Sequence, residues 1–369
     1  MLSVRACLAG ATLTTALLSA CNPKPPALPA VGVAYPPWAR GFIQVAESTL
    51  RERWGDSARV PRFVLDTDPA PERVERTVEW TQALLRTPGV SVIVGPSTSN
   101  AALAVAPIIN AAAIPEIIPN ATSRRLDQAG PWVFRLVGND SAEGAFLVRQ
   151  VLARPGLRRV LILYTNDEYG QGLRIGIHDE LQRAGLAPTA ELPVGRESDF
   201  ELLFRNELAH RRPDVILCAI RNPQFARAAA ALLHLGARLP VFVGDGAFGP
   251  RALRAAVGPV PFEIYGVAFW LRADADSAGR AYIQDFHRIR HEWPRGEDAL
   301  IHDALTLAAV ASRESGGDPR RIRLWLLSLG VTRPPFPGVA GPIDFRTDHP
   351  RRFRLGRFVF DSALDAEIR

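Results

Sequence analysis

Short apolar runs alternate along this chain with longer stretches in which apolar residues recur every three or four positions. The short runs are typical of buried strands, and the longer stretches are typical of helices that cover a sheet. In the first third of the chain this pattern predicts strands over residues 31–34, 62–65, 90–94 and 116–118, and helices over 41–53, 71–86 and 101–112. A strand–helix–strand series favours an α/β fold with a parallel sheet and helices on both faces.

The same alternation restarts after Asp140, which predicts a second unit of the same kind. Its predicted strands cover 159–164, 189–192, 215–220 and 241–243, and its helices cover 142–152, 170–184, 200–210 and 223–235. The last portion follows an apolar run over 266–270. It adds helices near 280–293, 299–314 and 320–329 and a hairpin between 341–345 and 357–360. We expect this last portion to complete both units.

Polar residues follow two strands of the first unit. The strand over 91–94 runs into Gly95-Pro-Ser-Thr-Ser99, and the next apolar run ends in Pro119-Asn-Ala-Thr-Ser123. Ligands of open α/β sheets bind beyond the carboxyl ends of the strands, where a helix N-terminus supplies N–H donors for an anion. The arrangement suits a small carboxylate.

Composition sets the size of the fold and excludes some partners. A chain of 369 residues with 47% hydrophobic and 22% charged content can bury a large core, and its length suggests two domains. The net charge is +6, and Lys24 is the only lysine, so 43 of the 44 basic residues are arginine. These arginines are interleaved with 38 acidic residues and form no single basic stripe, which argues against nucleic-acid binding.

The first 30 residues predict export. Residues 1–21 read as a signal peptide with Arg5 before a short apolar segment, and Leu18-Ser-Ala-Cys21 resembles a bacterial lipobox in which Cys21 is lipidated. The alternative is a plain secretory signal with an incidental cysteine. Residues 22–30 contain four prolines and predict an extended spacer. We therefore expect a protein anchored to the cell envelope by lipid only.

Two other features contain residue types that occur in catalytic or metal sites, but in both cases a structural role is favoured. Cys218 lies in an apolar run, where a buried strand thiol is the default and no histidine partner is indicated. His287 and His291, followed by Glu292, have a spacing that zinc can use, but no third ligand is placed, which favours a solvated helix face. No nucleophile elbow, phosphate loop or Cys-x-x-Cys pair is present. The sequence predicts no enzyme, cofactor or metal.

The segments Gly95-Pro-Ser-Thr-Ser99 and Ile118-Pro-Asn-Ala-Thr-Ser123, with Phe134-Arg135, Asp140 and Asn166-Asp-Glu-Tyr-Gly-Gln-Gly172 downstream, resemble the leucine/isoleucine/valine-binding family of type I periplasmic binding proteins. The resemblance spans most of residues 31–360. It implies two Rossmann-like lobes with mostly parallel sheets, joined by a three-strand hinge. The first lobe takes 31–138 and 270–332 and the second 139–268 and 333–369, with crossings near 138–140, 266–270 and 331–337. The ligand would lie between the lobes, and closure would bury it.

The resemblance also implies a binding site, built from hydroxyls and amides in the first lobe and an acid in the second. Ser99 and Thr122, which follows Asn120, match positions that bind the carboxylate of the ligand. Asp245 matches the acid that binds the ammonium group, and Asp140 and Tyr169 match positions that line the cleft. The alternatives are a helix N-cap for Ser99, a turn residue for Thr122, a hinge cap for Asp140 and a core-edge aromatic for Tyr169.

Two departures from the family pattern affect the expected ligand. The loop over 35–41 is short, so that Trp38 or Tyr35 could contact a ligand side chain or simply pack within the lobe. Arg221 stands where branched-chain-specific relatives have an aromatic residue, and it could pair with an acidic ligand or lie on the surface. Branched-chain specificity therefore does not follow.

Together these features predict a monomeric substrate-binding lipoprotein of an ABC importer, which delivers an amino acid or a related small amide or carboxylate to a permease. The alternative keeps the fold and replaces transport with ligand sensing or the activation of another envelope protein.

Overall fold

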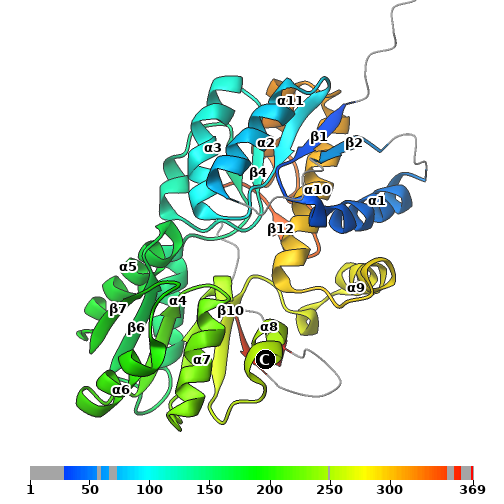
Figure 1. The fold of residues 1–369 in the computed structure, drawn as a ribbon. Coiled ribbons are helices and arrows are strands. Elements are labelled where there is room, and N and C mark those ends of the chain that lie inside the picture. The colour runs from blue at the N-terminus through cyan, green and yellow to red at the C-terminus, as the bar shows by residue number, and fades with distance from the viewer. Residues whose placement is uncertain are drawn as a thin grey trace, which may run out of the picture.

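The structure, a computed structural model, describes residues 29–55, 60–65, 73–247, 250–346, 353–358 and 367–368. It contains two α/β lobes, one at the top and one at the bottom of Figure 1. The predicted signal peptide, the lipidation site Cys21 and almost all of the predicted spacer lie outside the described residues. Within the described part of the chain, none of the helices is both long and apolar enough to cross a bilayer.

The first lobe is built on a parallel sheet with the strand order β2-β1-β3-β4-β5. These strands are β1 (Ala30–Val33), β2 (Arg62–Leu65), β3 (Val90–Val94), β4 (Glu116–Ile118) and β5 (Val133–Arg135). One face is covered by α1 (Arg40–Trp54), α10 (Gly296–Glu314) and α11 (Pro319–Ser328), and the other by α2 (Val74–Arg86) and α3 (Ser99–Ala112). Helix α9 (Ser277–Arg290) packs on α1.

The second lobe has the sheet order β14-β13-β10-β9-β8-β6-β7. The strands from β7 to β10 run parallel, and β13 and β14 are antiparallel additions at one edge. The strands are β6 (Val160–Thr165), β7 (Ala190–Val194), β8 (Val215–Ala219), β9 (Val241–Val243), β10 (Ile264–Ala268), β13 (Arg354–Phe358) and β14 (Glu367–Ile368). The helices are α4 (Asp140–Leu152) and α5 (Glu168–Arg183) on one face, and α6 (Phe200–His210), α7 (Gln224–His234) and α8 (Pro250–Val257) on the other.

The predicted two-lobe α/β fold is confirmed, but the predicted hairpin is wrong. Strand β12 (Gly341–Ile343) pairs with β11 (Phe336–Gly338), whereas β13 joins the second sheet beside β10. The turn between β11 and β12 is fixed by the buried Asp303, whose carboxylate accepts hydrogen bonds from the N–H groups of Val339 and Ala340 at 2.7 and 3.0 Å. Strand β12 therefore pairs with β11, which directly precedes it in the chain, and not with the expected segment at 357–360.

This pairing moves one crossing between the lobes. Phe336 and Ile343 belong to the core of the first lobe, and Phe345 packs against that core, whereas Phe358 belongs to the core of the second lobe. The third crossing therefore follows Phe345 and does not lie at 331–337, and the segment from residue 333 begins in the first lobe.

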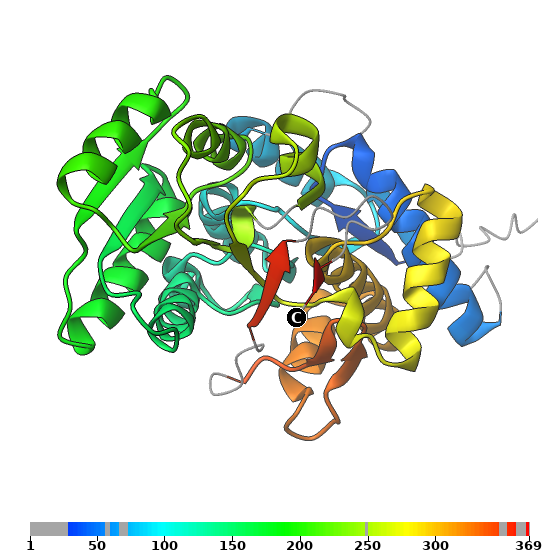
Figure 2. The ribbon, with the colours of Figure 1, turned by 90° about the horizontal axis from the view of Figure 1, so that it is seen from below.

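The crossing segments meet in a small apolar cluster between the lobes. Val137 from the first crossing and Phe269 from the second pack with Leu300, and Phe353 from the third lies against them. The rings of Phe269 and Phe353 are 5.3 Å apart. Seen from below in Figure 2, β13, in red, runs alongside the strand that carries the second crossing. The segments that connect the lobes are thus held together by an apolar contact.

Candidate ligand-binding site

The first-lobe side of the site begins at the carboxyl ends of β3 and β4. The two strands are parallel neighbours with Val94 opposite Ile117, so the segments that follow them leave the sheet at the same edge. After β3, Thr98 caps α3: its hydroxyl accepts a hydrogen bond from the N–H of Ala101 at 3.4 Å. The N-terminal amides of α3 therefore open toward the space between the lobes.

Ser99 and Thr122 are both buried beside this helix end. Because Thr98 is the N-cap, the alternative interpretation of Ser99 as the cap is wrong. The Ser99 hydroxyl oxygen accepts a hydrogen bond from the N–H of Ser123 at 3.3 Å, which joins the loop after β3 to the loop after β4. This contact leaves the Ser99 hydroxyl proton available to another acceptor. The Thr122 carbonyl accepts the N–H of Asp140 at 2.8 Å and so connects the site to the start of the second lobe.

The second-lobe side is built in the same way. Strands β6, β8, β9 and β10 lie side by side and run parallel, so the segments after them meet at one edge of the sheet. Tyr169 follows β6 in the first turn of α5, whose N-cap is Asp167. Arg221 follows β8, Asp245 follows β9, and Phe269 follows β10.

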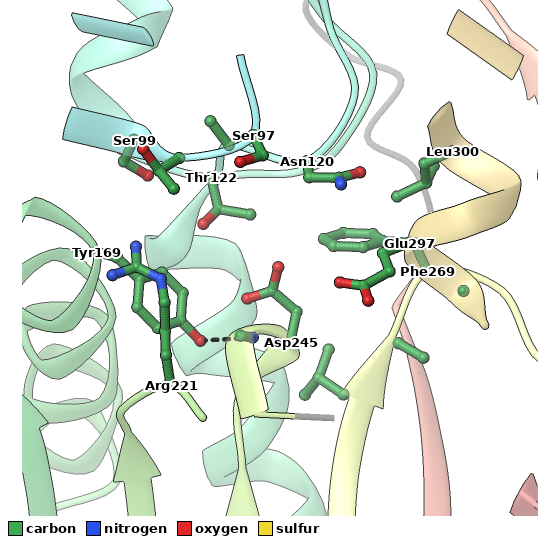
Figure 3. Close-up of a pocket in the computed structure, with 16 residues that line it drawn as sticks. Ser97, Ser99, Asn120, Thr122, Tyr169, Arg221, Asp245, Phe269, Glu297 and Leu300 are labelled. Carbon is green, nitrogen blue, oxygen red and sulfur yellow. Dashed lines mark hydrogen bonds between the residues drawn. The ribbon is translucent and has the colours of Figure 1, made fainter. Parts of the chain in front are cut away.

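Tyr169 contacts both Arg221 and the loop that carries Asp245. Its hydroxyl accepts a hydrogen bond from the N–H of Gly246 at 2.9 Å, and its ring lies 4.3 Å from the guanidinium of Arg221 (Figure 3). Arg221 is also paired with Asp167. Gly244 has no room for a side chain, because a Cβ atom there would lie 2.5 Å from the Tyr169 hydroxyl. The Gly-Asp-Gly sequence around Asp245 is thus required by the close approach of this loop to the tyrosine.

Two buried carboxyl groups, those of Asp140 and Glu143, lie close to Asp245, and both have raised pKa values. Burial raises the pKa of Asp140 to about 8; the Thr122 hydroxyl opposes this shift and the charge of Asp245 adds to it. Burial also raises the pKa of Glu143 well above its ordinary value, and the charges of Asp245 and Asp140 add to the shift. Glu143 accepts the N–H of Asp245 at 2.8 Å. Burial thus favours the uncharged form of both groups.

Asp245 and Glu297 are the acids that reach the cavity, and they come from opposite lobes. Burial raises the pKa of Asp245, whereas Tyr169, Glu143 and Arg221 lower it. Loss of water at the cleft wall raises the pKa of Glu297, although its side chain is 48% exposed; Arg295, at 2.6 Å, lowers this pKa, and the charges of Asp298 and Asp245 raise it. Figure 3 shows the carboxyl groups of Asp245 and Glu297 pointing toward one another across the cavity. A cation between them would relieve this repulsion.

These groups enclose a cavity of about 190 Å³ between the lobes. Hydroxyls and an amide line its first-lobe side, aromatic and apolar side chains line its hinge side, and the two acids and Arg221 complete it (Figure 3). The lining residues are Ser97, Thr98, Ser99, Asn120, Ala121, Thr122, Tyr169, Arg221, Asp245, Gly246, Val267, Ala268, Phe269, Gly296, Glu297 and Leu300.

Most of the predicted binding residues lie together at this cavity, namely Ser99, Asn120, Thr122, Tyr169, Arg221 and Asp245. Tyr169 is also part of the lobe core, so both of its interpretations hold. Asp140 is not in the lining and acts through Thr122 and Asp245; the cap of α4 is Asn139.

Trp38 does not line the cavity. It is 48% exposed and packs edge-on against Tyr35 and Phe42, so the expected ligand contact is wrong and the alternative of packing within the lobe is correct. None of the residues 35–41, which form the short loop after β1, lines a described cavity.

Three residues that line the cavity were not predicted from the sequence, namely Glu297, Phe269 and Leu300. Leu300 and Glu297 are in the first two turns of α10, far along the chain from the other site residues, and Phe269 is in the second crossing. Glu297 follows Gly296, whose Cβ would lie 2.8 Å from the carbonyl oxygen of Trp270. The only sequence signal was an acid directly before an apolar helix.

The two weaker chemical candidates take structural roles. Cys218 is a buried free thiol on β8, and burial raises its pKa. His287 stacks on Trp293 at 3.9 Å, and His291 caps the end of α9 in a left-handed conformation. Among the residues that the structure describes, no group of histidines, cysteines or carboxylates is arranged to hold a metal ion.

Comparisons with known proteins agree with this geometry. The family model described as periplasmic binding protein matches residues 71–352. The chain is 22% identical to an amino acid binding protein of Pseudomonas aeruginosa over 244 residues, which are 65% of this chain and 64% of that protein. Less than two thirds of that relative is thus covered.

Two solved structures show the same fold at low sequence identity. A substrate-binding protein of an ABC transporter from Desulfitobacterium hafniense, in complex with Leu, has a TM-score of 0.74 at 23% identity, covering 89% of this chain and 97% of that one. A solute-binding protein from R. palustris, in complex with 4-hydroxybenzoate, has a TM-score of 0.77 at 15% identity, covering 90% and 94%. Different ligands therefore occur on this fold.

Proposed function

Because the chain belongs to the periplasmic binding protein family, we propose that it is the substrate-binding protein of an ABC importer and holds an amino acid, or a related small amide or carboxylate, between its lobes. The observation that carries this proposal is the pair of acids, Asp245 and Glu297, which face each other across the cavity from opposite lobes. Opposite them lie the hydroxyls of Ser99 and Thr122 and the N-terminus of α3. One side thus suits an ammonium group and the other a carboxylate.

In the proposed complex the carboxylate of the ligand lies near the start of α3. The Ser99 hydroxyl has a proton to donate, and the Asn120 amide also faces the cavity. The ammonium group lies between Asp245 and Glu297 and satisfies both. Each charged end of the ligand is then paired, which offsets the cost of removing it from water.

The same contacts give a mechanism for the change of shape. The ligand touches both lobes only when they are closed, so binding shifts the population toward the closed state, which a permease can recognise. The rim already has contacts across the lobes: Glu168 accepts a hydrogen bond from Ser123 at 2.8 Å and pairs with Arg125 at 3.0 Å. Lipidation at Cys21 would hold the protein at the envelope beside its permease.

Thermal unfolding of the protein from Asn22 onward, freed of co-purified ligand, tests the proposal against free amino acids, their amides and small carboxylates. A ligand at about 100 times its Kd adds about 2.7 kcal/mol to the stability of the folded state, which is a measurable shift. Asp245→Asn should weaken binding by about 30-fold or more, because it removes one partner of a buried charge pair.

Asp179→Asn is the matched control, because Asp179 lies on α5 and lines none of the described cavities. It should leave the affinity unchanged. Absence of any shift across the whole panel would contradict the proposal and favour the alternative role in contacting another envelope protein.

A further inference from the structure

A second cavity, of about 710 Å³, lies at the mouth of the cleft and adjoins the first. Thr98 and Arg221 line both cavities. Like the inner cavity, the outer one is bounded by both lobes. Its first-lobe lining residues are Arg73, Val74, Thr98 and Asn100, and its second-lobe lining residues are Thr165, Asp167, Arg196, Arg221, Asn222, Pro223, Gln224 and Arg227. Closure therefore acts on both cavities at once, and a ligand longer than a simple amino acid can extend from one to the other.

The outer cavity is strongly cationic. Its lining includes the arginines Arg73, Arg196, Arg221 and Arg227, and Asp167 is the one acid among the described lining residues. Asp167 is already paired with Arg221. Three of the four guanidinium groups therefore have no carboxylate partner in this lining.

Among the described residues, none of the remaining arginines is paired with a carboxylate. Arg227 donates to the backbone carbonyls of Arg196 and Ser198, which fixes its position without neutralising it. For Arg73 and Arg196, no hydrogen bond or ion pair joins the guanidinium to another side chain among the residues that the structure describes. All three side chains are exposed to solvent, so an anion can reach them, and several like charges gathered at a cleft attract an anion more strongly than one alone.

The two cavities thus have opposite charge, and Arg221 marks their boundary. The inner cavity presents Asp245 and Glu297, whereas the outer one presents arginines. An amino acid with an apolar side chain would pair the inner groups and leave the outer ones unpaired. A ligand with an additional negative group at its far end would pair both.

We infer that the ligand of this protein is an amino acid or amino-acid conjugate with a distal carboxylate or phosphate, held by Arg73, Arg196 and Arg227 at the mouth of the cleft. This inference rests on the proposed function and names the ligand class of the same site. Guanidinium groups suit such a distal anion because each can donate two parallel hydrogen bonds to two oxygens of one carboxylate or phosphate group.

Isothermal titration of the same protein with matched pairs of probes tests the inference. The pairs are glutamine and glutamate, serine and O-phosphoserine, and γ-glutamylglycinamide and γ-glutamylglycine. In at least one pair the anionic member should bind about 10-fold more tightly or better, as expected for one charge-assisted contact. The first and third pairs test a carboxylate and the second tests a phosphate.

The variant Arg73→Gln/Arg196→Gln should reduce that preference to about 2-fold or less, because it removes two of the charges that provide it. Arg320→Gln is the control: Arg320 is exposed on α11, away from both cavities, and its loss should leave the preference unchanged. A preference that survives the double substitution would overturn the inference. So would binding of the neutral members with equal or greater affinity, and in that case the proposed function would stand. If no member of any pair binds, and no other amino acid does, the proposed function itself fails.

Discussion

Glu116 allows a quantitative test of the electrostatics of the first lobe. It is fully buried on β4, between Ile93 of β3 and Val133 of β5, and among the described residues neither of its carboxyl oxygens has a hydrogen-bond partner. Burial raises its pKa well above the ordinary value. The folded protein therefore keeps a proton on Glu116 that the unfolded chain releases.

The sign and size of the pH effect follow from this difference. The unfolded-state pKa of glutamate is about 4.3, so the folded state loses stability as the pH rises above that value toward the folded-state pKa. Each pH unit in this range costs about 1.4 kcal/mol, so that wild type should lose up to about 2.7 kcal/mol between about pH 5 and pH 7. Glu116→Gln cannot ionise and should not show this loss.

Guanidinium chloride unfolding of wild type and Glu116→Gln at about pH 5, 6 and 7 measures the effect. The other buried acids, such as Asp140 and Glu143, titrate equally in both proteins and cancel in the difference. Glu116→Met should in addition be more stable than Glu116→Gln by about 1–3 kcal/mol, because it removes polar atoms that have no partner. A difference between wild type and Glu116→Gln that stays constant with pH would refute the reasoning.

Three further predictions concern the site and its closure. Gly244→Ala should weaken ligand binding by about 10-fold or more in a titration, because the new Cβ would displace Tyr169 and with it the loop that carries Asp245. Glu168→Gln should raise the Kd by at most about 5-fold and expand the liganded protein slightly in small-angle scattering, since partly exposed ion pairs contribute about 1 kcal/mol or less; an unchanged scattering profile and Kd would show that the rim contacts do not hold the lobes together. Trp38→Ala should lower the melting temperature yet leave the Kd within about 2-fold, because Trp38 contacts Tyr35 and Phe42 and not the cavity; a larger change in Kd would contradict this placement.

The sequence by itself determined the features that depend on local periodicity and on residues at the ends of elements. The alternation of apolar runs predicted the β1 to β4 and β6 to β9 series closely, because strand and helix periods are set by the backbone. The resemblance to the periplasmic binding protein family, carried by short motifs, indicated Ser99, Thr122, Tyr169 and Asp245 as candidates, and Arg221 stood out as a departure from the family pattern. Each of them lies within about five residues of the end of a strand, and parallel strands place their carboxyl ends at one edge.

Only the tertiary structure decided the contacts between segments that are far apart in the chain. Strand pairing depends on which edges remain open once the lobes have packed, so β12 joined β11 and β13 joined β10, against the expected hairpin. Glu297 reaches the cavity because the chain returns to the first lobe before α10, and no local pattern records that return. Whether a charge near a strand end is free or paired likewise depends on burial and on neighbours from both lobes, which are set only when the lobes meet.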